Sequence, residues 1–246
     1  MDAIILMAGA GSRLGAAIPK PLVKIGGRPL ISYTFDALER VGVSDVHIVV
    51  GAHNGLAAEV RALLQREMRF HVIVNPEPQK QNGVSVLCAA GKVSTPFFLM
   101  MGDHLFEPAI FEALLAEGDQ SLVNLAIDRK IESIFDIDDA MKVQTERDRV
   151  VAIAKNLEDY DAIDTGAFLC SIDLFDYLNA ARRNGDCSLA DGVRAMAHDR
   201  KVRAVDIGEA WWQDVDTPEM LRRAEEESAR LLRDSRRRLT EESVTG

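Results

Sequence analysis

Apolar-rich runs of five or six residues alternate with amphipathic stretches along the first half of this chain. The runs that predict strands are residues 4–8, 46–50, 70–74 and 96–101. The stretches that predict helices are residues 29–42, a segment ending near residue 69, and residues 82–91. Strands and helices that alternate in this way indicate βαβ crossovers and a mostly parallel sheet covered on both faces.

The pattern changes after about residue 120, where strands begin to outnumber helices. The further predicted strands are residues 121–127, 163–170 and 201–207, with a β-hairpin formed by residues 140–144 and 150–154 around a charged turn. Two helical stretches follow residue 170, and a long, highly charged helix begins at Thr217. We therefore predict an α/β fold with a Rossmann-like, mostly parallel but mixed sheet, flanked by helices and extended by a smaller part that contains the hairpin.

Neither an internal repeat nor a low-complexity linker interrupts this pattern. We therefore expect a single domain over residues 1–232, made of two halves at about residues 1–120 and 121–216. The end of the chain is rich in charges and poor in large apolar side chains, which predicts a disordered tail over residues 233–246.

The composition excludes several classes of protein. Of the 246 residues 47% are hydrophobic, enough for a large core, and the net charge of −10 argues against a nucleic-acid partner, which requires a basic face. No apolar run approaches the roughly 20 residues that cross a bilayer. Three widely spaced cysteines and an N-terminus without a basic leader predict reduced thiols and a cytoplasmic location.

A glycine-rich loop follows the first predicted strand and precedes a lysine held between two prolines, Lys20. Glycines bring backbone N–H groups close to an anion, and the loop's Arg13 adds a second cation. A dinucleotide-binding fingerprint would need a glycine where Leu14 stands, and a P-loop would need Ser or Thr where Pro21 stands. The loop is therefore interpreted as a polyphosphate-binding turn of another kind.

Carboxylates follow at two places where they could hold a cation. Asp103 comes directly after the strand at residues 96–101, so it should lie at the carboxyl edge of the sheet beside the glycine loop. A carboxylate there suits Mg²⁺, although Asp103 could instead cap the next helix. Asp214 and Asp216 alternate in an extended segment, and we favour Asp216 over Asp214 as the second metal ligand.

The glycine loop together with Pro19-Lys20-Pro21-Leu22 resembles the opening motifs of the sugar-phosphate nucleotidyltransferase superfamily. The resemblance implies a nucleoside triphosphate site with Arg13 and Lys20 stabilising the charge that develops at the α-phosphorus. The residues expected to bind this nucleotide are Leu6, Ala8, Gly9, Ala10, Gly11, Ser12, Arg13, Lys20, Asn82, Gly83, Ser85, Gly102 and Asp103, with Asn82, Gly83 and Ser85 at the base and ribose.

Motifs in the middle of the chain resemble the cytidylyltransferases that act on inositol 1-phosphate. They are residues 136–143, 155–157 and 162–168, together with Gly102-Asp103-His104 and residues 211–219. The resemblance implies that Lys142 and Lys155 meet the acceptor phosphate. It also implies that acceptor hydroxyls bind near Asp136, Asp139, Thr165 and Gly166. Simpler interpretations stay open: Asn82-Gly83 as a tight turn, Asp139 in an exposed turn, and Lys142 on the solvated face of a hairpin.

The resemblance predicts an Mg²⁺-dependent transfer of CMP from CTP to inositol 1-phosphate, giving CDP-inositol and pyrophosphate. Alternatives are another acceptor (phosphocholine, a phosphonate or a hexose 1-phosphate) or a non-catalytic nucleotide-binding regulator. Many members of this family carry a membrane-embedded second half that uses the CDP-alcohol. The sequence leaves open whether this chain is a stand-alone enzyme or such a soluble part, and it leaves the oligomeric state open.

Overall fold

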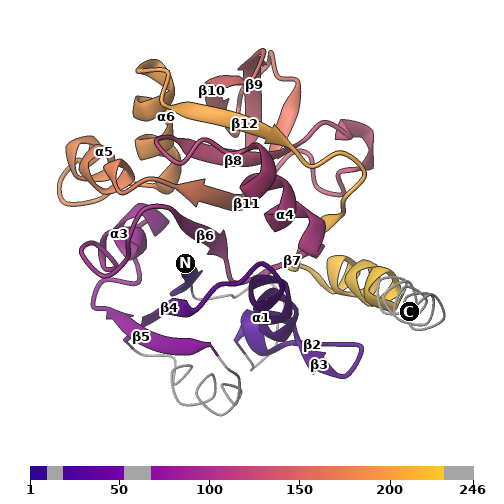
Figure 1. Ribbon diagram of the computed structural model, residues 1–246. Helices are drawn as coiled ribbons and strands as arrows, with labels where there is room; N and C mark the ends of the chain where they lie inside the picture. The colour runs from indigo at the N-terminus through magenta and orange to yellow at the C-terminus, as the bar shows by residue number, and fades with distance from the viewer. Residues whose placement is uncertain (10–18, 53–67, 230–246) are drawn as a thin grey trace, which may run out of the picture.

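A computed structural model of the protein describes residues 1–9, 19–52 and 68–229 (Figure 1). The predicted tail at residues 233–246 and most of the helix predicted to end near residue 69 lie outside these residues. None of the described helices is long and apolar enough to cross a membrane.

The centre of the fold is a nine-stranded mixed sheet with the strand order β5-β4-β1-β6-β11-β8-β12-β10-β9. The first four strands in this order are parallel: β5 (Arg69–Asn75), β4 (Asp45–Gly51), β1 (Asp2–Met7) and β6 (Phe97–Met101). Antiparallel β11 (Ala162–Cys170) joins them to β8 (Val123–Asp128), β12 (Val202–Asp206), β10 (Arg149–Ala154) and β9 (Lys142–Glu146). The sheet is therefore mixed as predicted, but parallel pairing prevails only in its first half.

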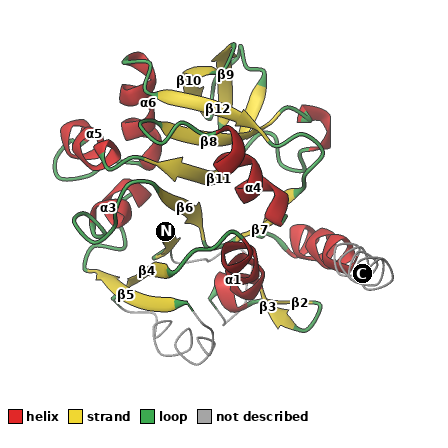
Figure 2. Cartoon of the chain, viewed as in Figure 1, coloured by secondary structure: helices red, strands yellow, loops and turns green. Residues whose placement is uncertain are grey.

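Successive residues of a strand point to opposite faces of the sheet. Both faces of this sheet carry apolar side chains, and helices cover both of them. Ala3, Ile5 and Met7 of β1 pack in one core cluster with α1 (Leu30–Arg40) and α4 (Pro108–Glu117). Ile4 and Leu6 pack on the other face, in a cluster with α3 (Asn82–Leu87), α5 (Asp173–Ala181) and α6 (Leu189–His198). Figure 2 shows these two groups of helices on opposite sides of the strands. The other described helical elements are two 3-10 turns, η2 (Lys20–Leu22) and η3 (Ile131–Ser133), and a helix over residues 218–229.

The predicted strands and hairpin are confirmed, and the predicted helices that fall on described residues are confirmed with slightly different ends. The sequence patterns missed two small sheets. One pairs β7 (His104–Phe106) with β13 (Trp212–Asp214), and the other pairs β2 (Lys24–Ile25) with β3 (Arg28–Pro29). Strands of two or three residues carry too little periodicity to be recognised, and each forms only because its partner is held beside it.

A β-bulge in β11 shapes the middle of the molecule. The pairing of β11 with β8 shifts register between Asp164 and Phe168, and Gly166 there has a φ of +79°. A Cβ on Gly166 would lie 3.0 Å from Met101 Cγ and 3.1 Å from the His104 ring. The bulge therefore brings the β11 backbone against the carboxyl end of β6, which a side chain at this position would prevent.

We predict that Asn124→Leu destabilises the fold, because Asn124 links three polar backbone groups in the core. Its side chain is fully buried, donates to Leu169 O (3.0 Å) and Asp119 O (2.9 Å), and accepts from Asp119 N (2.7 Å). Leucine has the same branching at Cγ but cannot hydrogen-bond, so it leaves these groups unpaired, and urea unfolding should report a loss of about 2–4 kcal/mol. The control is Ser121→Ala, which removes an exposed hydrogen bond to the same loop; equal stability of the two variants would contradict the prediction.

Candidate active site

The carboxyl ends of β1 and β6 meet at an ion cluster centred on Lys20. The Lys20 ammonium contacts Asp103 Oδ2 at 3.2 Å and also contacts Asp216 Oδ1. Asp216 reaches this place because the N–H of Val215 donates to the Asp103 carbonyl at 3.0 Å. Burial lowers the pKa of Lys20, but the charges and hydrogen bonds of Asp103 and Asp216 outweigh it and raise that pKa above its ordinary value. Lys20 is therefore a fixed positive charge.

Gly102 allows Asp103 to take this position. Its N–H donates to Leu6 O at 2.9 Å, which ties the end of β6 to β1. A Cβ on Gly102 would lie 2.4 Å from Met7 Cγ and 2.9 Å from Leu6 O. Only glycine permits this approach without moving the β1 backbone.

His104 supports Asp103 from the other side. Its Nδ1 lies 2.9 Å from Asp103 Oδ1, and its ring stacks on Trp212 with centroids 5.8 Å apart. Burial lowers the pKa of His104, but its hydrogen bond to Asp103 and the charges of Asp103, Asp214 and Asp164 raise it above the ordinary value. His104 thus packs on Trp212 and also stabilises the charge of the Asp103 carboxylate.

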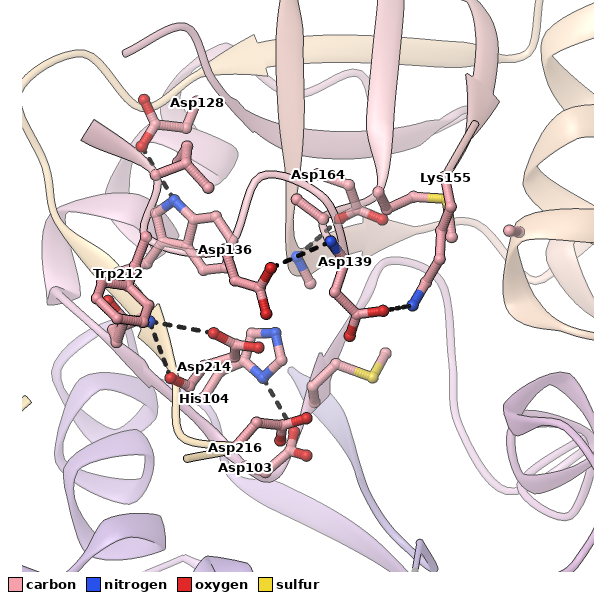
Figure 3. Close-up of a pocket in the computed structure, with 18 of the residues that line it drawn as sticks. Asp103, His104, Asp128, Asp136, Asp139, Lys155, Asp164, Trp212, Asp214 and Asp216 are labelled. Atoms are coloured by element: carbon pink, nitrogen blue, oxygen red, sulfur yellow. Dashed lines mark hydrogen bonds and ion pairs between the residues drawn. The ribbon is translucent and has the colours of Figure 1, made fainter. Parts of the chain in front are cut away.

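A cavity of about 390 Å³ opens beside this cluster. Its polar lining consists largely of carboxylates, namely Asp103, Asp128, Asp136, Asp139, Asp164, Asp214 and Asp216, with the cations Lys130, Lys155 and Arg223. Figure 3 shows several of these carboxylates turned toward a common space. Its aromatic lining comes from Phe135, Phe168, Trp211 and Trp212. Such a cavity suits a ligand that donates many hydrogen bonds and has apolar faces.

The structure brings many of the sequence-predicted site residues to this region. The larger cavity is lined by Asn82, Asp103, Asp136, Asp139, Lys155, Gly166 and Asp216. A smaller cavity of about 60 Å³ is lined by Leu6, Met7, Gly9, Lys20, Pro21 and Asp103, and Ala8 is buried beside it. Ala10, Gly11, Ser12 and Arg13 lie outside the described residues.

Four other predicted residues have structural contacts near the cavity, and two of them, Lys142 and Thr165, bond to backbone carbonyls. The Lys142 ammonium donates to Ile137 O (2.9 Å) and Lys155 O (2.8 Å), and the fully buried Thr165 hydroxyl donates to Ala126 O (2.9 Å). Ser85 accepts a hydrogen bond from Asn75 Nδ2 at 2.9 Å. A Cβ on Gly83 would lie 2.7 Å from Cys187 O, so this glycine lets α3 approach the chain before α6.

Sequence reasoning missed Asp164, which lines the cavity next to Gly166. Burial raises its pKa to about 6, although the Gly166 N–H donates to its carboxylate at 2.7 Å. Asp164 and Thr165 are neighbours in a strand and point to opposite faces, so the sequence could show that one of them faces the cavity but not which. An aspartate inside an apolar strand is rare, and this feature of the sequence could have identified Asp164 as a candidate site residue.

The cluster around Lys20 has the chemistry of a cation site. The described residues contain no group of three or more His, Cys, Asp or Glu side chains arranged to hold a metal ion. Asp103 and Asp216 nevertheless converge on one cation, the Lys20 ammonium. Two carboxylates are a donor set that fits a divalent cation whose remaining ligands come from a phosphate compound and water.

Several known proteins are similar to this chain. The bifunctional IPC transferase and DIPP synthase of Aquifex aeolicus is 33% identical over 227 residues, which are 90% of this chain and 50% of that protein. The CMP-5'-(3-aminopropyl)phosphonate synthase of Streptomyces rubellomurinus is 30% identical over 250 residues, covering 91% of this chain and 38% of that protein. The chain thus spans about half the length, or less, of these curated relatives.

Solved structures share the fold. The inositol-1-phosphate CTP transferase from T. maritima has a TM-score of 0.79 and 26% identity, covering 92% of this chain and 96% of that one. UDP-glucose pyrophosphorylase complexed with UDP-glucose has a TM-score of 0.78 at 16% identity, covering 93% and 98% of the two chains.

The family model described as the MobA-like NTP transferase domain matches residues 3–134, more than half of the chain. These residues include nearly all of β1, together with Lys20, Asp103 and part of the cavity lining. The chain therefore belongs to the family of MobA-like NTP transferase domains.

Proposed function

We propose that this chain is a cytidylyltransferase that transfers CMP from CTP to inositol 1-phosphate. The observation that carries the proposal is a carboxylate-lined cavity that opens directly beside a lysine held at the ends of β1 and β6. The similar proteins from Aquifex aeolicus and T. maritima, named an IPC transferase and an inositol-1-phosphate CTP transferase, support the same chemistry.

In this proposal CTP lies against the glycine loop and the smaller cavity. Lys20 and Arg13 stabilise the negative charge that grows on the α-phosphate and the leaving pyrophosphate. An oxygen of the acceptor phosphate attacks the α-phosphorus in line, and the bond from that phosphorus to the pyrophosphate oxygen breaks. The acceptor phosphate is already ionised at neutral pH, so no general base is required, and catalysis consists of positioning and charge neutralisation.

Asp103 and Asp216 are the residues that would hold Mg²⁺. Both carboxylates already converge on the Lys20 cation, whereas Asp214 lies opposite His104 in the β7–β13 pair. We therefore favour Asp216 over Asp214 as the second ligand. When bound, Mg²⁺ would neutralise charge on the triphosphate.

The acceptor would lie in the larger cavity. The hydroxyl groups of inositol are hydrogen-bond donors, and Asp136, Asp139 and Asp164 are acceptors around that space. Lys155, which pairs with Asp139, is the side chain best suited to the acceptor phosphate. Lys142 and Thr165 would act indirectly, through the backbone that they hold.

One observation favours a second acceptor class. Carboxylates beside Phe135 and Trp211 would also stabilise an ammonium group, by charge and by cation–π attraction. An aminoalkylphosphonate has such a group, and the name of the Streptomyces relative refers to this kind of compound.

The deciding experiment is an acceptor panel with CTP and Mg²⁺, read out as pyrophosphate release. We expect turnover with inositol 1-phosphate, its loss on chelation with EDTA, and its recovery on addition of Mg²⁺. Replacing CTP by ATP or UTP should abolish the reaction. Turnover with 3-aminopropylphosphonate, phosphocholine or glucose 1-phosphate in place of inositol 1-phosphate would refute the proposed acceptor, and nucleotide binding without any turnover would indicate a regulator.

Lys20→Ala should lower kcat at least ~100-fold, because it removes a charge that stabilises the transition state. The matched control is Lys24→Ala, four residues away in the same segment and exposed. Circular dichroism should show that both variants are folded. A Lys20→Ala enzyme with nearly full turnover would remove this residue from the mechanism.

Asp164→Asn should raise the KM for inositol 1-phosphate about tenfold, since a charged hydrogen-bond acceptor contributes about 1.5 kcal/mol to the hydrogen bond.

The Asp164→Asn substitution should also stabilise the fold at high pH. The pKa of Asp164 is about 6 in the folded protein, whereas an ordinary aspartate has a pKa of 3.8, so ionisation of Asp164 costs stability that grows as pH rises from about 4 to 6.

Urea unfolding of the wild type and Asp164→Asn at several pH values tests the second part. The variant should be more stable by about 1–3 kcal/mol at pH 8, and the difference should vanish near pH 4. A variant that is less stable at pH 8 would show that the ionised carboxylate contributes to folding.

A further inference from the structure

The last described helix begins just after Asp216 and sends one side chain back to the cavity. Arg223 lies in this helix, over residues 218–229, and lines the cavity. Its Nη2 donates to Ser133 O at 3.2 Å, and its guanidinium carbon lies 5.6 Å from the centre of the Phe135 ring. Arg223 thus connects the C-terminal helix with the chain after β8.

We call residues 131–139 the acceptor segment, because it contains Asp136 and Asp139. After η3 it consists of one extended residue followed by turns, so its hydrogen bonds to the rest of the fold determine its position. Lys142 holds it through Ile137 O, and Asp139 pairs with Lys155. Phe135 is 39% exposed, unusual for a phenylalanine, and the Arg223 guanidinium covers part of its ring.

We propose that Arg223 is a positioning residue for the acceptor, acting through Ser133 and Phe135 rather than on the reacting atoms. By stacking on Phe135 and bonding to Ser133, it fixes the end of the acceptor segment that leads into Asp136. The helix that carries Arg223 starts beside Asp216, a neighbour of Lys20, so one rigid element spans the nucleotide side and the acceptor side. Only the expected change in KM rests on the proposed function; the contacts of Arg223 with Ser133 and Phe135 do not.

The proposal predicts a change in acceptor binding without a change in nucleotide binding. Arg223→Ala and Phe135→Ala should each raise the KM for inositol 1-phosphate about five- to tenfold, as expected for loss of a partly exposed cation–π contact and a hydrogen bond. The kcat and the KM for CTP should stay within about twofold. Arg223→Lys keeps the cation and should recover part of the affinity.

A double-mutant cycle separates positioning from direct contact. If Arg223 acts through Phe135, the Arg223→Ala/Phe135→Ala double variant should be no more than about twofold worse than the worse single variant. The proposal would be overturned if the increases in KM of the two single variants multiplied in the double variant, or if the KM for CTP rose in parallel. Arg222→Ala, the adjacent and exposed arginine, is the control and should behave as the wild type.

A second measurement needs no turnover and so distinguishes failure of this inference from failure of the proposed function. Chymotrypsin should cleave after Phe135 several times faster in Arg223→Ala than in the wild type or Arg222→Ala, because the acceptor segment opens more often. The thermal midpoints of the three proteins should agree. Equal cleavage rates would overturn the positioning role, whatever the acceptor is.

Discussion

The contact of one ammonium group, that of Lys20, with two carboxylates organises this structure. Asp103 follows β6, Asp216 precedes the last helix, and Lys20 begins η2, so the three residues come from segments far apart in the chain. Two carboxylates brought this close repel each other unless a cation lies between them. The Lys20 charge therefore stabilises the arrangement of carboxylates that the proposed metal–triphosphate site requires.

The structure also requires the backbone to approach neighbouring residues closely at two positions, and both are glycines. Gly102 lets the end of β6 contact Leu6, and Gly166 lets the β11 bulge contact the His104 ring. As a result His104 is held between Gly166 and Trp212, and it fixes the Asp103 carboxylate by a hydrogen bond. The ion cluster owes its geometry to these two positions without a side chain.

In the larger cavity, where we propose that the acceptor binds, some residues face the space and others hold the surrounding backbone. Lys155 faces it while Lys142 holds the backbone carbonyls of Ile137 and Lys155. Asp164 faces it while Thr165 is tied to β8. The burial of Asp164 opposes its ionisation, so this carboxylate costs folding stability to provide a polar group in the cavity.

The sequence by itself determined the alternation of strands and helices and the proximity of Lys20 and Asp103, and it predicts a phosphate-binding role for the first loop. These follow from local patterns and from the rule that parallel strands end at one edge. Only the tertiary structure decided that Asp216 rather than Asp214 meets Lys20, that Asp164 rather than Thr165 lines the cavity, and that Arg223 reaches Phe135. Alternation along a strand shows which residues share a face, but the direction of that face depends on register, on a bulge and on pairing with residues distant in the chain.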